Sequence, residues 1–113
     1  MRKLLVLALI VAASAILATQ ALAAGTRSVK VGDNFYVRPS GVPTVTVRKG
    51  TKVVWQFKGH SPHTVVVSSG PVKFRSSAKS SGTFAKTLTK RGTYRIFCSI
   101  HGAADQSMKL VVK

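Results

Sequence analysis

The chain is poor in cysteine and in acidic residues. Among its 113 residues, Cys98 is the only cysteine, and Asp33 and Asp105 are the only residues with a carboxylate side chain. A single cysteine excludes an internal disulfide. Two carboxylates are too few for enzymes that use a pair of them as general acid and base, and no glycine-rich loop of the kind that cradles phosphate is present. We therefore expect that the protein is not an enzyme.

Positive charge, by contrast, is abundant. The 18 Lys and Arg residues set the formal net charge at +16, and loss of Arg2 and Lys3 with an export signal lowers it to +14. Such a charge attracts acidic partner proteins and allows electrostatic association with an anionic membrane or cell surface. The basic residues are scattered over nearly every expected strand, and no aromatic and basic motif for nucleic acid is present. We therefore expect no specific nucleic-acid partner.

The first 23 residues have the features of a signal peptide. Two basic residues precede the apolar run Leu4–Ala18, and Ala21–Ala23 supplies small residues for cleavage. The apolar run is shorter than the ~20 residues that a membrane-spanning helix needs, so cleavage is favoured over a retained anchor. We expect a signal peptide over residues 1–23 and one domain over residues 24–113. The expected destination is the periplasm or the extracellular face of the cytoplasmic membrane.

After the signal, apolar and polar residues alternate with a period of two in short runs. Turn residues such as Lys49-Gly50 and Arg91-Gly92 separate these runs, and no helical stripe is present. Many short strands at close spacing predict an all-β fold, an antiparallel Greek-key sandwich or barrel of about eight strands. The expected strands are Ser28–Val31, Phe35–Arg38, Thr44–Arg48, Lys52–Phe57, Thr64–Val67, Val72–Arg75, Thr83–Leu88, Thr93–Cys98 and Met108–Val112.

The alternation also predicts which side chains face the core, because successive side chains of a strand point to opposite faces. The residues expected to point inwards are Val53, Trp55 and Phe57, then Tyr94, Ile96 and Cys98, then Met108, Leu110 and Val112, with Gln106 in phase with the last set. One strand conflicts with this rule, because Lys86 falls between Phe84 and Leu88 on the core face. Either a bulge or a lysine that extends its ammonium group to solvent would account for it.

Three residues are candidate metal ligands. Cys98 is expected at the end of its strand, and His101 follows three residues later in a loop. His63 comes after the turn Ser61-Pro62 and opens an apolar strand, so a sandwich can bring it to the same end. A thiolate and two imidazoles are the ligands of electron-transfer copper, usually with a weak axial ligand. An inward Cys98 would be a poor nucleophile, and His60 is expected in a solvated loop.

Three segments of the chain resemble the plastocyanin-like branch of the cupredoxins, the small blue copper proteins. They are Val53-Val54-Trp55-Gln56-Phe57, Pro62-His63-Thr64-Val65-Val66 and Gly92-Thr93-Tyr94-Arg95-Ile96-Phe97-Cys98-Ser99-Ile100-His101. The resemblance extends over roughly residues 28–113. It implies an exported mononuclear type 1 copper protein with one copper ion per chain. His63, Cys98 and His101 would be the equatorial ligands.

The axial position departs from the plastocyanin pattern. That pattern has a methionine five residues after the second histidine, where this chain has Gln106, and Met108 comes two residues later. Gln106 would make the site similar to that of the stellacyanin-like cupredoxins, in which glutamine is the axial ligand. An amide oxygen is a harder donor than a thioether, so it should favour Cu(II) and lower the reduction potential. Gln106 is our first choice, Met108 the second, and a site without an effective axial ligand the third.

The resemblance implies a monomeric carrier of single electrons that cycles between Cu(II) and Cu(I). The positive charge then predicts acidic redox partner proteins. The same ligands would also serve an exported protein that binds copper and delivers it. A third interpretation is a secreted basic β domain that binds anionic polymers, with Cys98 as a buried structural thiol. Stoichiometric binding of copper separates the first two interpretations from the third.

Overall fold

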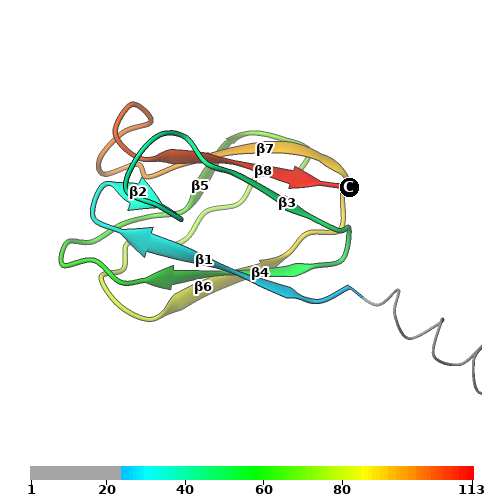
Figure 1. Cartoon of the computed structure of the whole chain (residues 1–113), viewed down its shortest axis with the longest axis horizontal. Helices are drawn as coiled ribbons and strands as arrows, with labels where there is room; N and C mark the ends of the chain where they lie inside the picture. The colour runs from blue at the N-terminus through cyan, green and yellow to red at the C-terminus, as the bar shows by residue number, and fades with distance from the viewer. Residues whose placement is uncertain (1–23) are drawn as a thin grey trace, which may run out of the picture.

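The computed structural model describes residues 24–113, which form two β-sheets packed face to face (Figure 1). The predicted signal peptide, residues 1–23, lies outside the described residues. Within residues 24–113, no helix is long and apolar enough to cross a membrane. The eight strands and two sheets confirm the prediction of an all-β fold.

Each sheet contains four strands, in the orders β2-β1-β4-β6 and β3-β8-β7-β5. The strands are β1 (Thr26–Gly32), β2 (Phe35–Tyr36), β3 (Thr44–Val47), β4 (Lys52–Phe57), β5 (Val66–Ser69), β6 (Thr83–Thr87), β7 (Gly92–Phe97) and β8 (Ser107–Val112). Pairing is antiparallel except between β1 and β4 and between β3 and β8, which run parallel. Both sheets are therefore mixed, a detail that the expected antiparallel arrangement did not include. Parallel strands that lie side by side cannot be joined by a tight turn. Between β1 and β4 the chain therefore passes through β3 of the other sheet, and most successive strands lie in different sheets.

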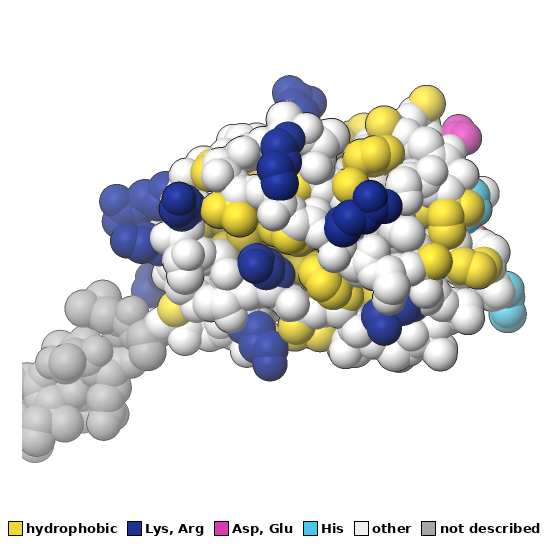
Figure 2. Space-filling model, turned by 180° about the vertical axis from the view of Figure 1, so that it is seen from behind, with side chains coloured by type: hydrophobic (Ala, Val, Ile, Leu, Met, Phe, Trp, Pro, Cys, Tyr) yellow, Lys and Arg dark blue, Asp and Glu magenta, His cyan; other side chains and the backbone are white. Residues whose placement is uncertain are grey.

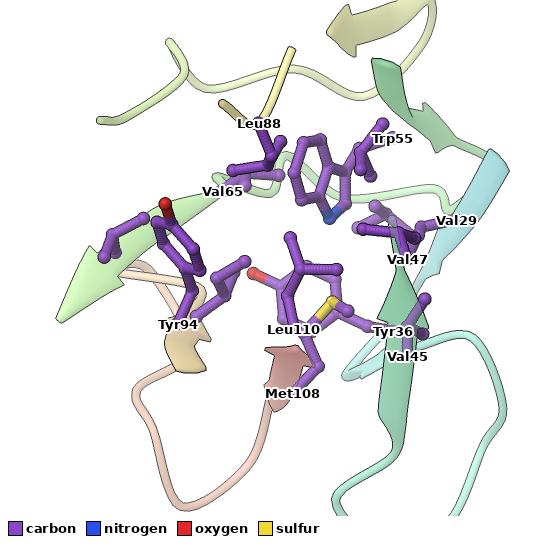
Figure 3. Close-up of a cluster of buried hydrophobic side chains, with 14 of the residues drawn as sticks. Val29, Tyr36, Val45, Val47, Trp55, Val65, Leu88, Tyr94, Met108 and Leu110 are labelled. Carbon is purple, nitrogen blue, oxygen red and sulfur yellow. The ribbon is translucent and has the colours of Figure 1, made fainter. Parts of the chain in front are cut away.

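The core lies between the two sheets. Trp55 is completely buried at its centre, and its ring centroid lies 6.0 Å from that of Phe74 and 5.8 Å from that of Phe84. Figure 3 shows Trp55 among side chains from both sheets, such as Val29 and Leu110. The inward-facing residues predicted from the alternation are confirmed, since none of the nine is more than 4% exposed and Gln106 is 1% exposed.

The conflict at Lys86 is resolved in favour of an extended lysine. Strand β6 pairs with β4 in regular register, without a bulge. Lys86 is half-buried, and its Nζ lies 5.8 Å from the centroid of the Phe74 ring. The side chain thus covers the edge of the core with its methylene groups, and its ammonium group lies over an aromatic face.

Apart from β5, which begins two residues after the expected start at Thr64, two expected strands differ clearly from the structure. Val72–Arg75 is not a strand: it forms one bridge, between Arg75 and Val66, and its apolar side chains pack half-buried against the core. The alternation of apolar and polar residues in this segment arises because every second side chain packs against the core. A segment that packs in this way has the same sequence pattern as a strand, so the pattern alone cannot tell the two apart. The expected strand Phe35–Arg38 is shorter, because Val37 has a φ of 67°, in the left-handed region that strands do not use.

Candidate metal centre

His63, Cys98 and His101 come together at one end of the sandwich. Cys98 directly follows β7, His101 lies in the β7–β8 loop, and His63 lies just before β5; these segments lie at the left end of Figure 1. The ligand atoms of the three side chains all lie within 4.8 Å of one another. His63 and Cys98 are fully buried and His101 is half-buried. The two imidazole ring centroids are 4.7 Å apart.

The backbone around His63 is held by a loop rather than by the sheet. Strand β5 begins at Val66, two residues later than expected. The N–H of His63 donates to the carbonyl of Lys79, and the N–H of Lys79 donates to the carbonyl of His63, each at 2.9 Å. Two residues after His63, the N–H of Val65 donates a hydrogen bond to Oγ of Ser76, which lies in the same connection as Lys79, at 2.9 Å. The connection between β5 and β6 therefore fixes the segment that carries His63.

The sulfur of Cys98 lies among hydrogen-bond donors. The N–H of Thr64 donates to Sγ at 3.5 Å, and His101 Nδ1 lies 3.4 Å from it. Burial raises the pKa of the Cys98 thiol, but hydrogen bonds from the backbone of Thr64, His101 and Ile100 and from the His101 ring outweigh it and lower the pKa from 9.0 to about 6. Cys98 is therefore a thiolate at neutral pH, the form that binds metal ions.

The amide of Gln106 is anchored with its oxygen towards His63. Its Nε2 donates to the carbonyl of Gly32 at 3.1 Å and to the carbonyl of Phe35 at 2.9 Å. Because both of these partners are acceptors, the amide nitrogen must lie on their side. Oε1 then faces Nδ1 of His63 at 2.9 Å.

The His63 ring lies between two acceptors. Its Nε2 is 2.9 Å from Oδ1 of Asp33, and its Nδ1 faces Oε1 of Gln106. Burial lowers the pKa of His63, but the hydrogen bonds with Asp33, Cys98 and Gln106 together outweigh it and raise the pKa. A positive charge on the ring therefore suits these surroundings. A metal ion could take the place of the Nδ1 proton while Asp33 keeps the hydrogen on Nε2.

These residues fit a copper ion. A thiolate, two imidazole nitrogens and a nearby amide oxygen converge on one place, which matches the donor set of mononuclear electron-transfer copper. The predicted grouping of His63, Cys98 and His101 is therefore present in the structure. Met108 lies in β8 opposite Ile96 and belongs to the hydrophobic core.

Two neighbours of the site were not found from the sequence. Thr64 Oγ1 accepts a hydrogen bond from the N–H of Ser99 at 2.8 Å. Asp33 accepts from His63, and hydrogen bonds from His63, His60 and Ser61 lower its pKa well below its usual 3.8. The only local signal was that Asp33 is one of two acidic residues. His60 is exposed and lies outside the ligand group, as expected.

We expect the thiol of Cys98 in the metal-free folded protein to ionise with a midpoint near pH 6. Thiolate absorbance near 240 nm, measured against pH, reports this directly, and the chain unfolded in denaturant should return to the ordinary value of 9.0. Because the pKa is lower in the folded state, ionisation of this thiol stabilises the fold above pH 9 and loses its effect as the pH falls through 6. The variant Cys98→Ser, which has no thiol, gives the background absorbance to be subtracted. A midpoint near 9 in the folded protein would contradict the proposed surroundings of the sulfur.

A small β-sandwich that brings a buried thiolate and two imidazoles together at one end defines a class of protein, the mononuclear copper proteins called cupredoxins. Residues 40–113 match the family model for copper binding proteins of the plastocyanin/azurin family. The chain belongs to this family, and copper is its metal. Membership of a family of copper-binding proteins agrees with the prediction that the chain is not an enzyme.

Solved structures show the same fold. The chain is similar to the Cu(I) form of an amicyanin in which one methionine is replaced by glutamine, with 25% identity and a TM-score of 0.65 over 79% of this chain and 83% of that one. It is also similar to a purple cupredoxin from Nitrosopumilus maritimus, with 17% identity and a TM-score of 0.64 over 77% of this chain and 99% of that one. At that lower identity the second likeness shows the fold alone.

Proposed function

We propose that the protein is an exported type 1 copper protein that carries single electrons between redox partners. The observation that supports this most directly is that the ligand atoms of His63, Cys98 and His101 lie within 4.8 Å of one another in a chain of a copper-binding family. These three side chains would hold the ion. Bound copper would supply the one-electron couple between Cu(II) and Cu(I).

Hydrogen bonds around the proposed ligands favour electron transfer, because they hold the ligands in place. Thr64 bonds to Ser99 and so links the residue after His63 to the residue after Cys98. The hydroxyl of Tyr36 donates to the carbonyl of Thr64 at 2.6 Å within the core. Ligands held in this way should move little when the oxidation state changes, so the energy needed for reorganisation is small.

We infer that Gln106 is the axial ligand, as in the stellacyanin-like cupredoxins. Its anchored amide and the 2.9 Å approach of Oε1 to His63 Nδ1 support this choice. Met108 is the second candidate, although its side chain packs with core residues such as Leu110 (Figure 3). An amide oxygen in this position would lower the reduction potential relative to a thioether.

His101 is the proposed exit for the electron. It is the half-buried member of the ligand group, and the neighbouring Ile100 is 52% exposed. In Figure 2, histidine side chains lie at one end of the molecule beside hydrophobic ones, whereas Lys and Arg side chains are scattered over the rest of the visible face. An apolar contact area on a positively charged protein suits acidic redox partners, whose approach the charge would steer. The same charge would allow association with an anionic membrane surface.

We further propose that residues 1–23 are removed as a signal peptide. Residues 24–113 would then act as a monomer in the periplasm or on the extracellular face of the cytoplasmic membrane. The basic start, the apolar run and the small residues Ala21–Ala23 support this proposal.

The test starts from the full chain expressed for export, whose mass after recovery shows whether cleavage follows Ala23. Loaded with copper, the protein is expected to show an intense visible charge-transfer band and a reversible one-electron wave. Its rate of electron exchange with an acidic redox protein should fall as ionic strength rises, because salt screens the attraction. Absence of the band would contradict the copper site. Ready transfer of copper to an acceptor protein, without a reversible wave, would favour delivery instead.

A further inference from the structure

The turn between β1 and β2 lies against the copper end of the sandwich. Gly32 pairs with Phe35 across it, so the turn consists of Asp33 and Asn34, and Asn34 has a left-handed φ of 64°. Asparagine tolerates that conformation better than most residues. The tight turn presents the carboxylate of Asp33 and the carbonyl groups of Gly32 and Phe35 to residues of the site.

The carboxylate of Asp33 holds both His63 and the loop that leads to it. Oδ1 lies 2.9 Å from His63 Nε2 and accepts hydrogen bonds from the N–H of His60 at 3.0 Å and the N–H of Ser61 at 3.2 Å. The hydroxyl of Ser61 also donates to Oδ1, at 3.0 Å. The side chain of Asp33 is 41% exposed and that of His63 is fully buried. The carboxylate therefore covers the outer edge of a buried ring.

Gly59 leaves the space that this contact needs. A Cβ at position 59 would overlap Oδ1 of Asp33 and lie 3.0 Å from His63 Nε2. The backbone of Gly59 is not in the left-handed region, so the missing side chain is required by space and not by conformation. The same turn reaches Gln106 as well, through its two carbonyl groups.

We propose that Asp33 is a positioning residue for the copper ligand His63, and that the β1–β2 turn holds His63 and Gln106 together from one side. This rests on the proposed function, in which these two residues bind copper. Asp33 accepts the hydrogen of Nε2, which leaves Nδ1 to face the metal and prevents rotation of the ring. A negative charge behind the imidazole also makes it a stronger donor, which favours Cu(II) over Cu(I) and lowers the reduction potential.

Three substitutions test this proposal. Asp33→Ala removes the acceptor and the charge, Asp33→Asn keeps an acceptor, and Asp105→Asn removes the same charge at an exposed position in the β7–β8 loop. We expect Asp33→Ala to weaken copper binding about 10- to 100-fold and to raise the reduction potential. Asp33→Asn should recover most of the affinity and keep a raised potential. Asp105→Asn should keep the affinity and shift the potential less than Asp33→Asn does.

A glycine substitution tests the contact without any change in charge. Gly59→Ala should displace the carboxylate and reproduce the weakened copper binding of Asp33→Ala. Gly25→Ala is its matched control, because a Cβ there meets nothing within 4 Å. In the metal-free protein, nitrogen NMR of the His63 ring should show a strongly hydrogen-bonded Nε2–H. This bond should weaken in Asp33→Ala, where Ser61 Oγ, 3.3 Å from Nε2, is the remaining neighbour. That measurement does not depend on copper.

The outcomes separate this proposal from the proposed function. Wild-type affinity and potential in both Asp33→Ala and Gly59→Ala, with a normal copper band, would overturn the role of Asp33 and leave the copper site intact. If Asp33→Ala does not fold, Asp33→Asn decides: a potential equal to that of Asp105→Asn overturns the proposal. If the wild-type protein has no copper band, the proposed function fails, and the role of Asp33 fails with it.

Discussion

Replacement of Cys98 by serine is expected to abolish the intense visible absorption of the copper-loaded protein. The absorption arises when charge moves from a soft, polarisable sulfur to Cu(II), and a serine oxygen cannot replace that donor. Copper affinity should also fall by more than the roughly 10- to 100-fold typical of residues that only support a ligand. Absorption spectra and a competitive chelator titration measure the two effects.

The metal-free fold should survive this change. Serine is close in size to cysteine, so the packing around the buried side chain at position 98 should change little. Circular dichroism of the metal-free variant checks this. His60→Ala is the matched control, because His60 is exposed and contacts Asp33 through its backbone N–H, which alanine keeps. A visible band that survives in Cys98→Ser would show that another group provides the colour, and the proposed site would be wrong.

Replacement of Gln106 by methionine is expected to raise the reduction potential. A thioether is a softer donor than an amide oxygen, so it stabilises Cu(I) relative to Cu(II). We expect the relative preference for Cu(I) to increase at least tenfold, which corresponds to about 59 mV for a one-electron couple. Voltammetry gives the potential, and absorption and paramagnetic-resonance spectra report the changed axial donor.

The same substitution should also destabilise the metal-free protein. Methionine cannot donate to the carbonyl groups of Gly32 and Phe35, which Gln106 Nε2 reaches at 3.1 and 2.9 Å. Leaving buried acceptors without a donor costs about 1–3 kcal/mol, measurable as a lower free energy of unfolding in denaturant. Met108→Leu is the control, since it preserves volume in the core. If Met108→Leu changes the spectrum and Gln106→Met does not, Met108 is the axial ligand.

Much of the site could be predicted because it depends on short spacings. The alternation of Tyr94, Ile96 and Cys98 predicts that the thiol points inwards, and all three are at most 1% exposed. His101 follows Cys98 within one loop, so their proximity is a local property of the chain. The inward phase of Gln106 was predicted in the same way, from the strand that follows it.

Other features could not be predicted, because alternation describes direction and not hydrogen bonding. Val72–Arg75 has the pattern of a strand, yet it makes a single bridge and packs on the core. The strand after His63 was expected to begin at Thr64, but β5 begins at Val66, and the residues before it pair with the loop between β5 and β6 instead. The alternation of apolar and polar residues does not indicate which hydrogen-bond partner a backbone N–H or carbonyl group has in the folded protein.

The composition and the alternation of the chain were sufficient for the all-β class, the inward faces and the Cys98–His101 pair. Each of these follows from residues a few positions apart, whose relative directions the strand geometry sets. The contact of Asp33 with His63 joins residues 30 positions apart, and that of Gln106 with Gly32 joins residues 74 apart. Such contacts exist only once the two sheets have packed and brought their loops to one end. The support of the copper ligands was therefore decided by the tertiary structure.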